Sequence, residues 1–135
     1  MAAIDTLLFD FGGTLDADGV AWKERFHALY RGEGLDMTAE AFASAFFAAD
    51  DPLVGALPAA AGLTETIAAL AANLEAELGG RAETAKERTD GDRGQRVASR
   101  FLADMSAIFA RNRPALESLA DRYRLGVVSN FYGNL

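Results

Sequence analysis

Apolar positions along the chain follow two patterns, one typical of buried strands and one typical of helices. Segments 4–9 (IDTLLF) and 125–128 (LGVV) are short and mostly apolar, and polar or glycine residues follow soon after each. This pattern predicts two strands covered on both faces, as in a parallel sheet. Between them, apolar residues recur every three or four positions, which predicts several helices. The order strand, helices, strand therefore predicts an α/β fold.

Helix boundaries follow from capping residues and from breaks in the apolar pattern. Thr38 is a plausible N-cap for a helix that runs to about residue 49. Gly79 and Gly80 predict the end of a helix that begins near residue 63, and Pro114 predicts the start of another. Segment 81–96 (RAETAKERTDGDRGQR) has almost no apolar residues, so we expect a solvated helix end and a mobile loop around residues 90–94.

Polar side chains follow both predicted strands. Asp10 comes directly after the first strand, and Ser129 and Asn130 come directly after the second. Because active sites of parallel sheets lie at the carboxyl ends of their strands, we expect these residues to form a common site.

Composition narrows the class of protein. The chain has 135 residues, half of them apolar, which is enough for a domain with a hydrophobic core. Its net charge of −7 argues against nucleic-acid binding, and the absence of cysteine excludes disulfides and thiolate chemistry. A basic leader and an apolar stretch of membrane-spanning length are both missing, so a cytoplasmic protein without a membrane partner is expected.

Two short motifs resemble those of the haloacid dehalogenase (HAD) superfamily. Segment 9–16 (FDFGGTLD) resembles the first motif, an apolar strand followed by Asp-x-Asp-Gly-Thr-Leu, and segment 124–130 (RLGVVSN) resembles the second. The resemblance implies a partial HAD-like Rossmannoid parallel sheet, formed by residues 1–16 and 114–135. It also implies an inserted α-helical bundle cap of the C1 type, formed by residues 17–113. The third and fourth motifs would follow Leu135, so we expect only the N-terminal portion of the fold.

The resemblance also implies a function. The chain would be a Mg²⁺-dependent phosphatase of a small phosphorylated metabolite, acting through an aspartyl-phosphate intermediate. Asp10 would be the nucleophile, and Mg²⁺ would be held by Asp10 and the backbone carbonyl of Gly12. The implied phosphate-binding residues are Gly13, Thr14, Ser129 and Asn130.

Gly12 departs from this motif, because phosphatases of the family carry a second aspartate there as general acid and base. Losing such a group typically costs about 10²–10⁴-fold in rate, so impaired or incomplete activity is expected. An equally good explanation is a backbone conformation that only glycine tolerates. The neighbouring Asp16 and Asp18 are candidate substitutes, although the motif gives them no such role. For Asp10 itself, the structural alternative is a helix N-cap or an acid in the turn after a strand.

Two alternatives to a phosphatase remain open. The first is a non-catalytic truncated fragment or interaction module, which would pair with another chain as a homo-oligomer or strand-swapped dimer to bury its open strand edges. The other is a 2-haloacid dehalogenase, which uses the same aspartate but usually has tyrosine at the position of Gly12. Trp22 is interpreted mainly as a packing residue of the cap.

Overall fold

The computed structural model describes residues 4–81, 91–129, 131 and 132. Helices make up 66% of the structure, and the strands lie near its two ends in sequence. The elements in chain order are β1 (Thr6–Asp10), the short helical segment η1 (Phe11–Leu15), α1 (Trp22–Gly32), α2 (Ala39–Asp50), the short helical segment η2 (Asp51–Leu53), α3 (Leu63–Arg81), α5 (Arg93–Ala120) and β2 (Arg124–Val128).

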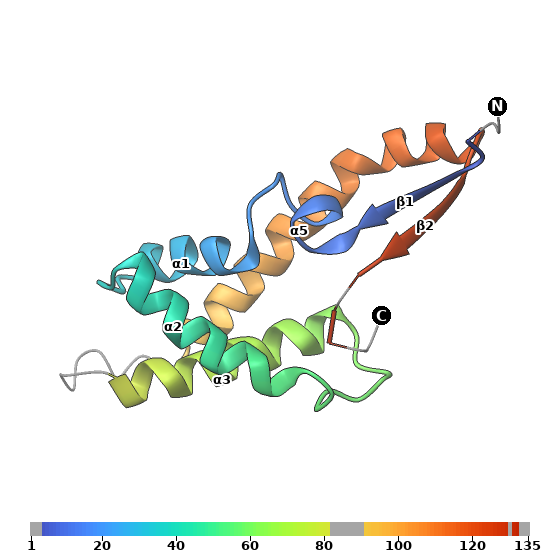
Figure 1. Ribbon diagram of the computed structural model, residues 1–135. Helices are drawn as coiled ribbons and strands as arrows, with labels where there is room; N and C mark the ends of the chain where they lie inside the picture. The colour runs from blue at the N-terminus through green and yellow to red at the C-terminus, as the bar shows by residue number, and fades with distance from the viewer. Residues whose placement is uncertain (1–3, 82–90, 130, 133–135) are drawn as a thin grey trace.

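The hydrophobic core lies among the helices. Helices α1, α2, α3 and the first half of α5 pack together, and the C-terminal half of α5 extends away from them and leads into β2 (Figure 1). Burying a large apolar side chain contributes about 1.5–3 kcal/mol, so this cluster is the main source of stability. Its fully buried large apolar members are Phe26, Tyr30, Phe42, Ile67, Leu70, Leu74, Val97, Phe101 and Met105.

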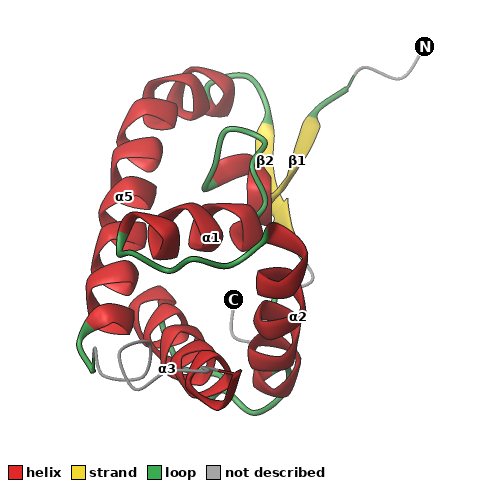
Figure 2. Cartoon of the chain, turned by 90° about the vertical axis from the view of Figure 1, so that its left-hand side faces the viewer, coloured by secondary structure: helices red, strands yellow, loops and turns green. Residues whose placement is uncertain are grey.

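The sheet has two parallel strands, β1 and β2, with Thr6 opposite Arg124 and Asp10 opposite Val128. The strands lie side by side at the edge of the helical part (Figure 2). The parallel pairing was predicted, but the prediction that both strands are covered on two faces is wrong. No residue of either strand is buried, and Leu8, Val127 and Val128 are 65%, 55% and 60% exposed.

The prediction of an α/β fold with a partial HAD-like Rossmannoid sheet is also wrong. Among the described residues the protein is mostly helical, with one two-stranded parallel sheet. Two strands of five residues each are too few to form a layer around which helices pack. The core is therefore made by helix–helix contacts, and the sheet lies outside it.

One predicted helix boundary is confirmed, and two others, at a glycine pair and at a proline, are not. Thr38 caps α2 as predicted, its Oγ accepting a hydrogen bond from the Ala41 N–H at 3.2 Å. However, α3 continues through Gly79 and Gly80, and α5 passes through Pro114 without a break. Pro114 is exposed, so water can compensate the carbonyl that loses its partner there. The predicted boundary between the cap (residues 17–113) and the core (residues 114–135) thus lies within helix α5. The division into core and cap stays a prediction.

Part of the polar segment 81–96 also belongs to α5. Residues 82–90 lie outside the described part of the chain, but Arg93 and Gly94 are buried in the first turn of this helix. The guanidinium of Arg93 donates two hydrogen bonds of 3.0 Å to the carboxylate of Glu75 on α3. This bidentate pair joins α5 to α3, so the prediction of a solvated loop at Arg93 and Gly94 is wrong.

Candidate functional site

Three of the predicted site residues line one pocket, with a volume of about 390 Å³. Asp10 ends β1, Gly12 lies in the following turn, and Ser129 follows β2. Parallel pairing with Asp10 opposite Val128 places these segments together, as the positions at strand ends predicted. The complete lining is Asp10, Gly12, Ala21, Trp22, Phe46, Asp50, Val54, Ser129, Phe131 and Tyr132.

Asp10 lies in an exposed position at the end of β1, with extended backbone angles (φ −72°, ψ 150°). Its Oδ1 accepts a hydrogen bond of 2.8 Å from the Phe11 N–H, which caps η1. The capping role considered as an alternative is therefore present. It is compatible with a further role in the pocket, because this contact involves one of the two carboxylate oxygens.

Gly12 and Gly13 occupy the two central positions of a tight turn. Gly12 has φ −64° and ψ 118°, and Gly13 has φ 82° and ψ −9°, which are the angles of a type II turn. Only the second position requires a left-handed conformation. A Cβ atom on Gly12 would have no heavy atom within 4 Å. The explanation that position 12 needs glycine for its backbone is therefore wrong, whereas Gly13 does need it.

Asp16 is fully buried and holds this turn in place. Its Oδ1 accepts a hydrogen bond of 2.7 Å from the Gly13 N–H, and its Oδ2 accepts one from the indole N–H of Trp22. The Nη1 of Arg25 lies 3.5 Å from Oδ2 and donates to the Asp16 carbonyl at 3.0 Å. With its carboxylate engaged by these donors, Asp16 is a structural residue and a poor substitute for the acid missing at position 12.

Two other predicted phosphate-binding residues, Gly13 and Thr14, are not among the residues that line this pocket. Gly13 and Thr14 belong to the turn beside the pocket, and the Gly13 N–H is already used by Asp16. Asn130 lies outside the described residues. Asp18, the second candidate acid, is exposed and pairs with Arg111 of α5. Among the predicted phosphate-binding side chains that the structure describes, Ser129 is therefore the one that lines the pocket.

The reasoning from sequence missed Asp50 and Tyr132. Asp50 ends α2, and its Oδ1 accepts a hydrogen bond from the Tyr132 hydroxyl. Burial raises the pKa of Asp50 above its usual value of 3.8; the bond from Tyr132 opposes this shift, and the neighbouring Asp51 adds to it. Burial and the bond to Asp50 also raise the pKa of Tyr132. A usable signal was the pair of acids at the C-terminal end of an apolar helix, where the helix dipole disfavours negative charge.

Aromatic rings line another part of the pocket. The centroid of the Phe131 ring lies 5.5 Å from the centroid of the Trp22 ring and 4.8 Å from that of the Tyr132 ring, and both pairs are in edge-on arrangements. Trp22 also contacts Phe101 of the core at 5.3 Å, as its interpretation as a packing residue requires. The pocket thus combines a polar end, with Asp10 and Ser129, and aromatic surface suited to an organic group.

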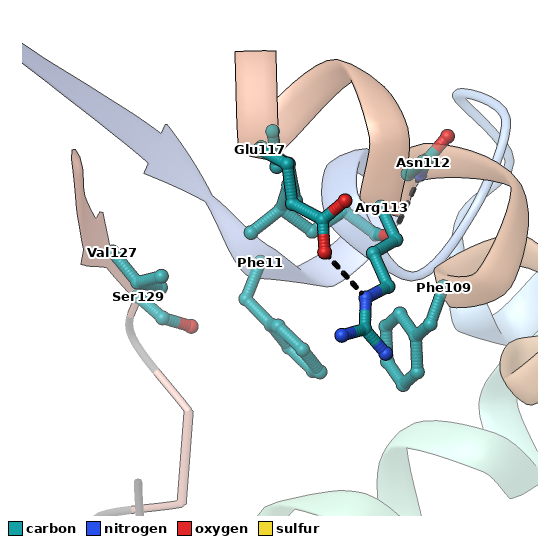
Figure 3. Close-up of a pocket in the computed structure, with 9 residues that line it drawn as sticks. Phe11, Phe109, Asn112, Arg113, Glu117, Val127 and Ser129 are labelled. Atoms are coloured by element: carbon teal, nitrogen blue, oxygen red, sulfur yellow. Dashed lines mark hydrogen bonds and ion pairs between the residues drawn. The ribbon is translucent and has the colours of Figure 1, made fainter. Parts of the chain in front are cut away.

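A larger pocket of about 820 Å³ lies between the strands and α5 (Figure 3). Val127 and Ser129 lie on one side of it, Phe11 near its centre and Phe109 on the side of α5 (Figure 3). Its lining is mostly apolar, with an ion pair of 2.7 Å between Arg113 and Glu117. This pocket contains Ser129 but not Asp10, so the predicted chemistry belongs to the smaller one.

The donor atoms around the pocket determine whether it could hold a metal ion. Among the described residues there is no group of three or more His, Cys, Asp or Glu side chains that would hold a metal ion. Asp10 and the Gly12 carbonyl are two oxygen donors of the kind that Mg²⁺ prefers. Because Mg²⁺ often takes one or two carboxylates together with waters and substrate phosphates, this donor set fits an ion shared with a substrate.

No helix in the described part of the chain is long and apolar enough to cross a membrane. Comparison with protein-family models, with curated proteins and with solved structures found no match. A functional assignment therefore depends on the two sequence motifs and on the pocket that Asp10, Gly12 and Ser129 line.

Proposed function

We propose that the chain is a HAD-type hydrolase that acts with Mg²⁺ on a small phosphorylated metabolite through an aspartyl-phosphate intermediate. The observation that carries the proposal is the pocket shared by Asp10, Gly12 and Ser129. Asp10 and Ser129 come from opposite ends of the sequence, and the parallel pairing of β1 and β2 brings them together. A nucleophilic carboxylate and a hydroxyl donor beside a small pocket are suited to phosphoryl transfer.

In the first step, an Asp10 oxygen attacks phosphorus and the bond to the leaving-group oxygen breaks. The Ser129 hydroxyl donates a hydrogen bond to a phosphoryl oxygen, and the rings of Trp22 and Phe131 contact the organic part of the substrate. Water then attacks the aspartyl phosphate and releases inorganic phosphate. Mg²⁺ bound by Asp10 and the Gly12 carbonyl would offset the negative charge of the phosphoryl group.

The charges of the pocket support a requirement for a cation. Its described lining contains no basic side chain, and the carboxylate of Asp10 lies among it. Two like charges 4 Å apart repel by about 4 kcal/mol at the effective dielectric constant near a protein surface. A phosphate dianion would therefore bind poorly unless a cation accompanies it, so we expect activity to depend on Mg²⁺.

Hydrolysis of p-nitrophenyl phosphate and of acetyl phosphate tests this proposal. We expect Mg²⁺-dependent turnover that EDTA removes and that Asp10→Asn abolishes. Asp18→Asn serves as the control, because Asp18 is an exposed acid of the same loop region and does not line the pocket. Turnover that survives Asp10→Asn, or turnover that is lost equally in the control, would contradict the assignment.

The open sheet favours a second candidate function, an interaction module that pairs with a second copy of the chain. Leu8, Val127 and Val128 are each more than half exposed on strands with no further partner among the described residues. Pairing of such strands would remove apolar surface from water. Light scattering over a concentration series should then detect a dimer that Leu8→Glu dissociates. A catalytically active monomer at all concentrations would argue against this candidate.

A further inference from the structure

We propose that Asp50, positioned by Tyr132, is the general acid and base of this pocket and takes the role that Gly12 cannot fill. This role presupposes the phosphatase activity proposed above. It adds a catalytic residue from α2, outside both sequence motifs, to a site otherwise made by the two strand ends.

The position of Asp50 carries the argument. Asp10 and Asp50 line the same pocket of about 390 Å³, one from the end of β1 and the other from the end of α2. The other two acids near the turn are engaged elsewhere, Asp16 with buried donors and Asp18 with Arg111. Asp50 is therefore the second carboxyl group that a substrate bound at Asp10 would meet.

The surroundings of Asp50 suit proton transfer. Asp50 is half-buried, and the Tyr132 hydroxyl donates to its Oδ1, which fixes the orientation of the carboxyl group. The titratable groups that act on it are Tyr132 beside it and Asp51 at the start of η2. Burial raises the pKa of Asp50, so a larger share of it is protonated near neutral pH than of an ordinary aspartate. Two carboxyl groups in different environments can divide the nucleophilic and the acid–base roles.

The proposed proton transfers balance over one turnover. As Asp10 forms its bond to phosphorus and the bond to the leaving-group oxygen breaks, the Asp50 carboxylic acid gives its proton to that oxygen. The Asp50 carboxylate then takes a proton from water while the water oxygen attacks phosphorus and the bond to Asp10 breaks. Asp50 is again protonated, Asp10 is again a carboxylate, and inorganic phosphate leaves.

A leaving-group comparison tests the proposal with the full chain and Mg²⁺. Phenyl phosphate needs a proton on its leaving oxygen far more than p-nitrophenyl phosphate does. We expect Asp50→Asn to lower kcat on phenyl phosphate by about 100-fold or more, and on p-nitrophenyl phosphate by less than about 10-fold. Asp18→Asn, a change at an exposed acid that does not line the pocket, should leave the ratio of the two rates near that of the wild type. The Asn amide oxygen can still accept the Tyr132 hydrogen bond, so the fold should be retained.

Equal losses on both substrates, or no loss on either, would overturn the role of Asp50 while leaving Asp10 as nucleophile. Activity that survives Asp10→Asn, or no hydrolysis of either substrate by the wild type, would overturn the proposed function and this role with it.

A measurement that does not need activity is the carboxyl ¹³C titration of Asp50 by NMR. We expect the titration midpoint of Asp50 to lie above 3.8. The midpoint should rise further in Tyr132→Phe, because the hydrogen bond from the Tyr132 hydroxyl favours the ionised form of Asp50. A midpoint at or below the ordinary value would contradict the proposal.

Discussion

Replacing Gly12 with alanine should stabilise the protein, whereas the same replacement at the next residue, Gly13, should not. Both glycines lie in the turn after β1, and a Cβ atom at either position would have no heavy atom within 4 Å. The two positions differ in backbone conformation, because φ is −64° at Gly12 and 82° at Gly13. The pair of variants therefore isolates the effect of the left-handed conformation from that of packing.

The expected magnitudes follow from two contributions. Alanine restricts the unfolded chain, which stabilises a protein by about 0.4–1 kcal/mol where the native angles suit it. This contribution is common to both variants. A left-handed conformation costs a residue with a Cβ atom about 1–2 kcal/mol, and this penalty applies at Gly13 alone. The free energy of unfolding of Gly13→Ala should thus lie about 1–2 kcal/mol below that of Gly12→Ala, which should itself exceed that of the wild type.

Urea denaturation followed by circular dichroism measures these differences, provided that the slope of the transition is unchanged between variants. Equal destabilisation by Gly12→Ala and Gly13→Ala would contradict this prediction. That result would mean that the turn has other angles in solution, and it would restore the explanation that position 12 needs glycine.

Three further predictions concern the acids near the pocket. Asp16→Asn should lower the free energy of unfolding by about 3 kcal/mol, because it removes the buried carboxylate that pairs with the partly buried guanidinium of Arg25. The exposed Asp18→Asn should change the free energy of unfolding by less than about 0.5 kcal/mol, as urea denaturation would show. Because burial raises the pKa of Asp50 in the folded state, its contribution to stability is present below 3.8 and is lost as the pH rises through the folded value. The stability of Asp50→Asn relative to the wild type should therefore increase with pH over this range, and a constant or decreasing difference in thermal denaturation would contradict this. When Gly12→Asp is added to Asp50→Asn, the rate of phenyl phosphate hydrolysis should rise at least about 10-fold, because position 12 has room for an acidic side chain. An unchanged rate in the double variant would contradict the prediction that an acid at position 12 can transfer the proton.

The helices were predictable where a local signal agreed with the tertiary packing. The recurrence of apolar residues every three or four positions indicated helices between the strands, and Thr38 indicated the start of α2. Gly79, Gly80 and Pro114 were misleading, since each costs helix stability locally but lies within a longer helix held by its packing. The predicted burial of the two strands also failed, because short apolar segments indicate strands without indicating whether the sheet or the helices form the core.

Part of the pocket lining was predictable because two of its residues follow the ends of paired strands. Asp10 and Ser129 line the same pocket, as their positions indicated. The contact between Asp50 and Tyr132 joins residues 82 positions apart, and no local pattern encodes it. The same holds for Arg93, whose polar surroundings in sequence suggested a loop although its partner Glu75 lies 18 positions away on another helix. Burial of such groups depends on contacts that sequence spacing alone does not define.

Trp22 gives this protein a built-in optical probe. It is the only tryptophan in the sequence, so the intrinsic indole emission comes from one known position. Its indole N–H binds the carboxylate that holds the turn, and its ring faces the pocket that contains Asp10. Fluorescence therefore reports on both the integrity of the turn and the occupancy of the pocket without any label. Ligand screening and unfolding can thus be followed through the same unmodified side chain.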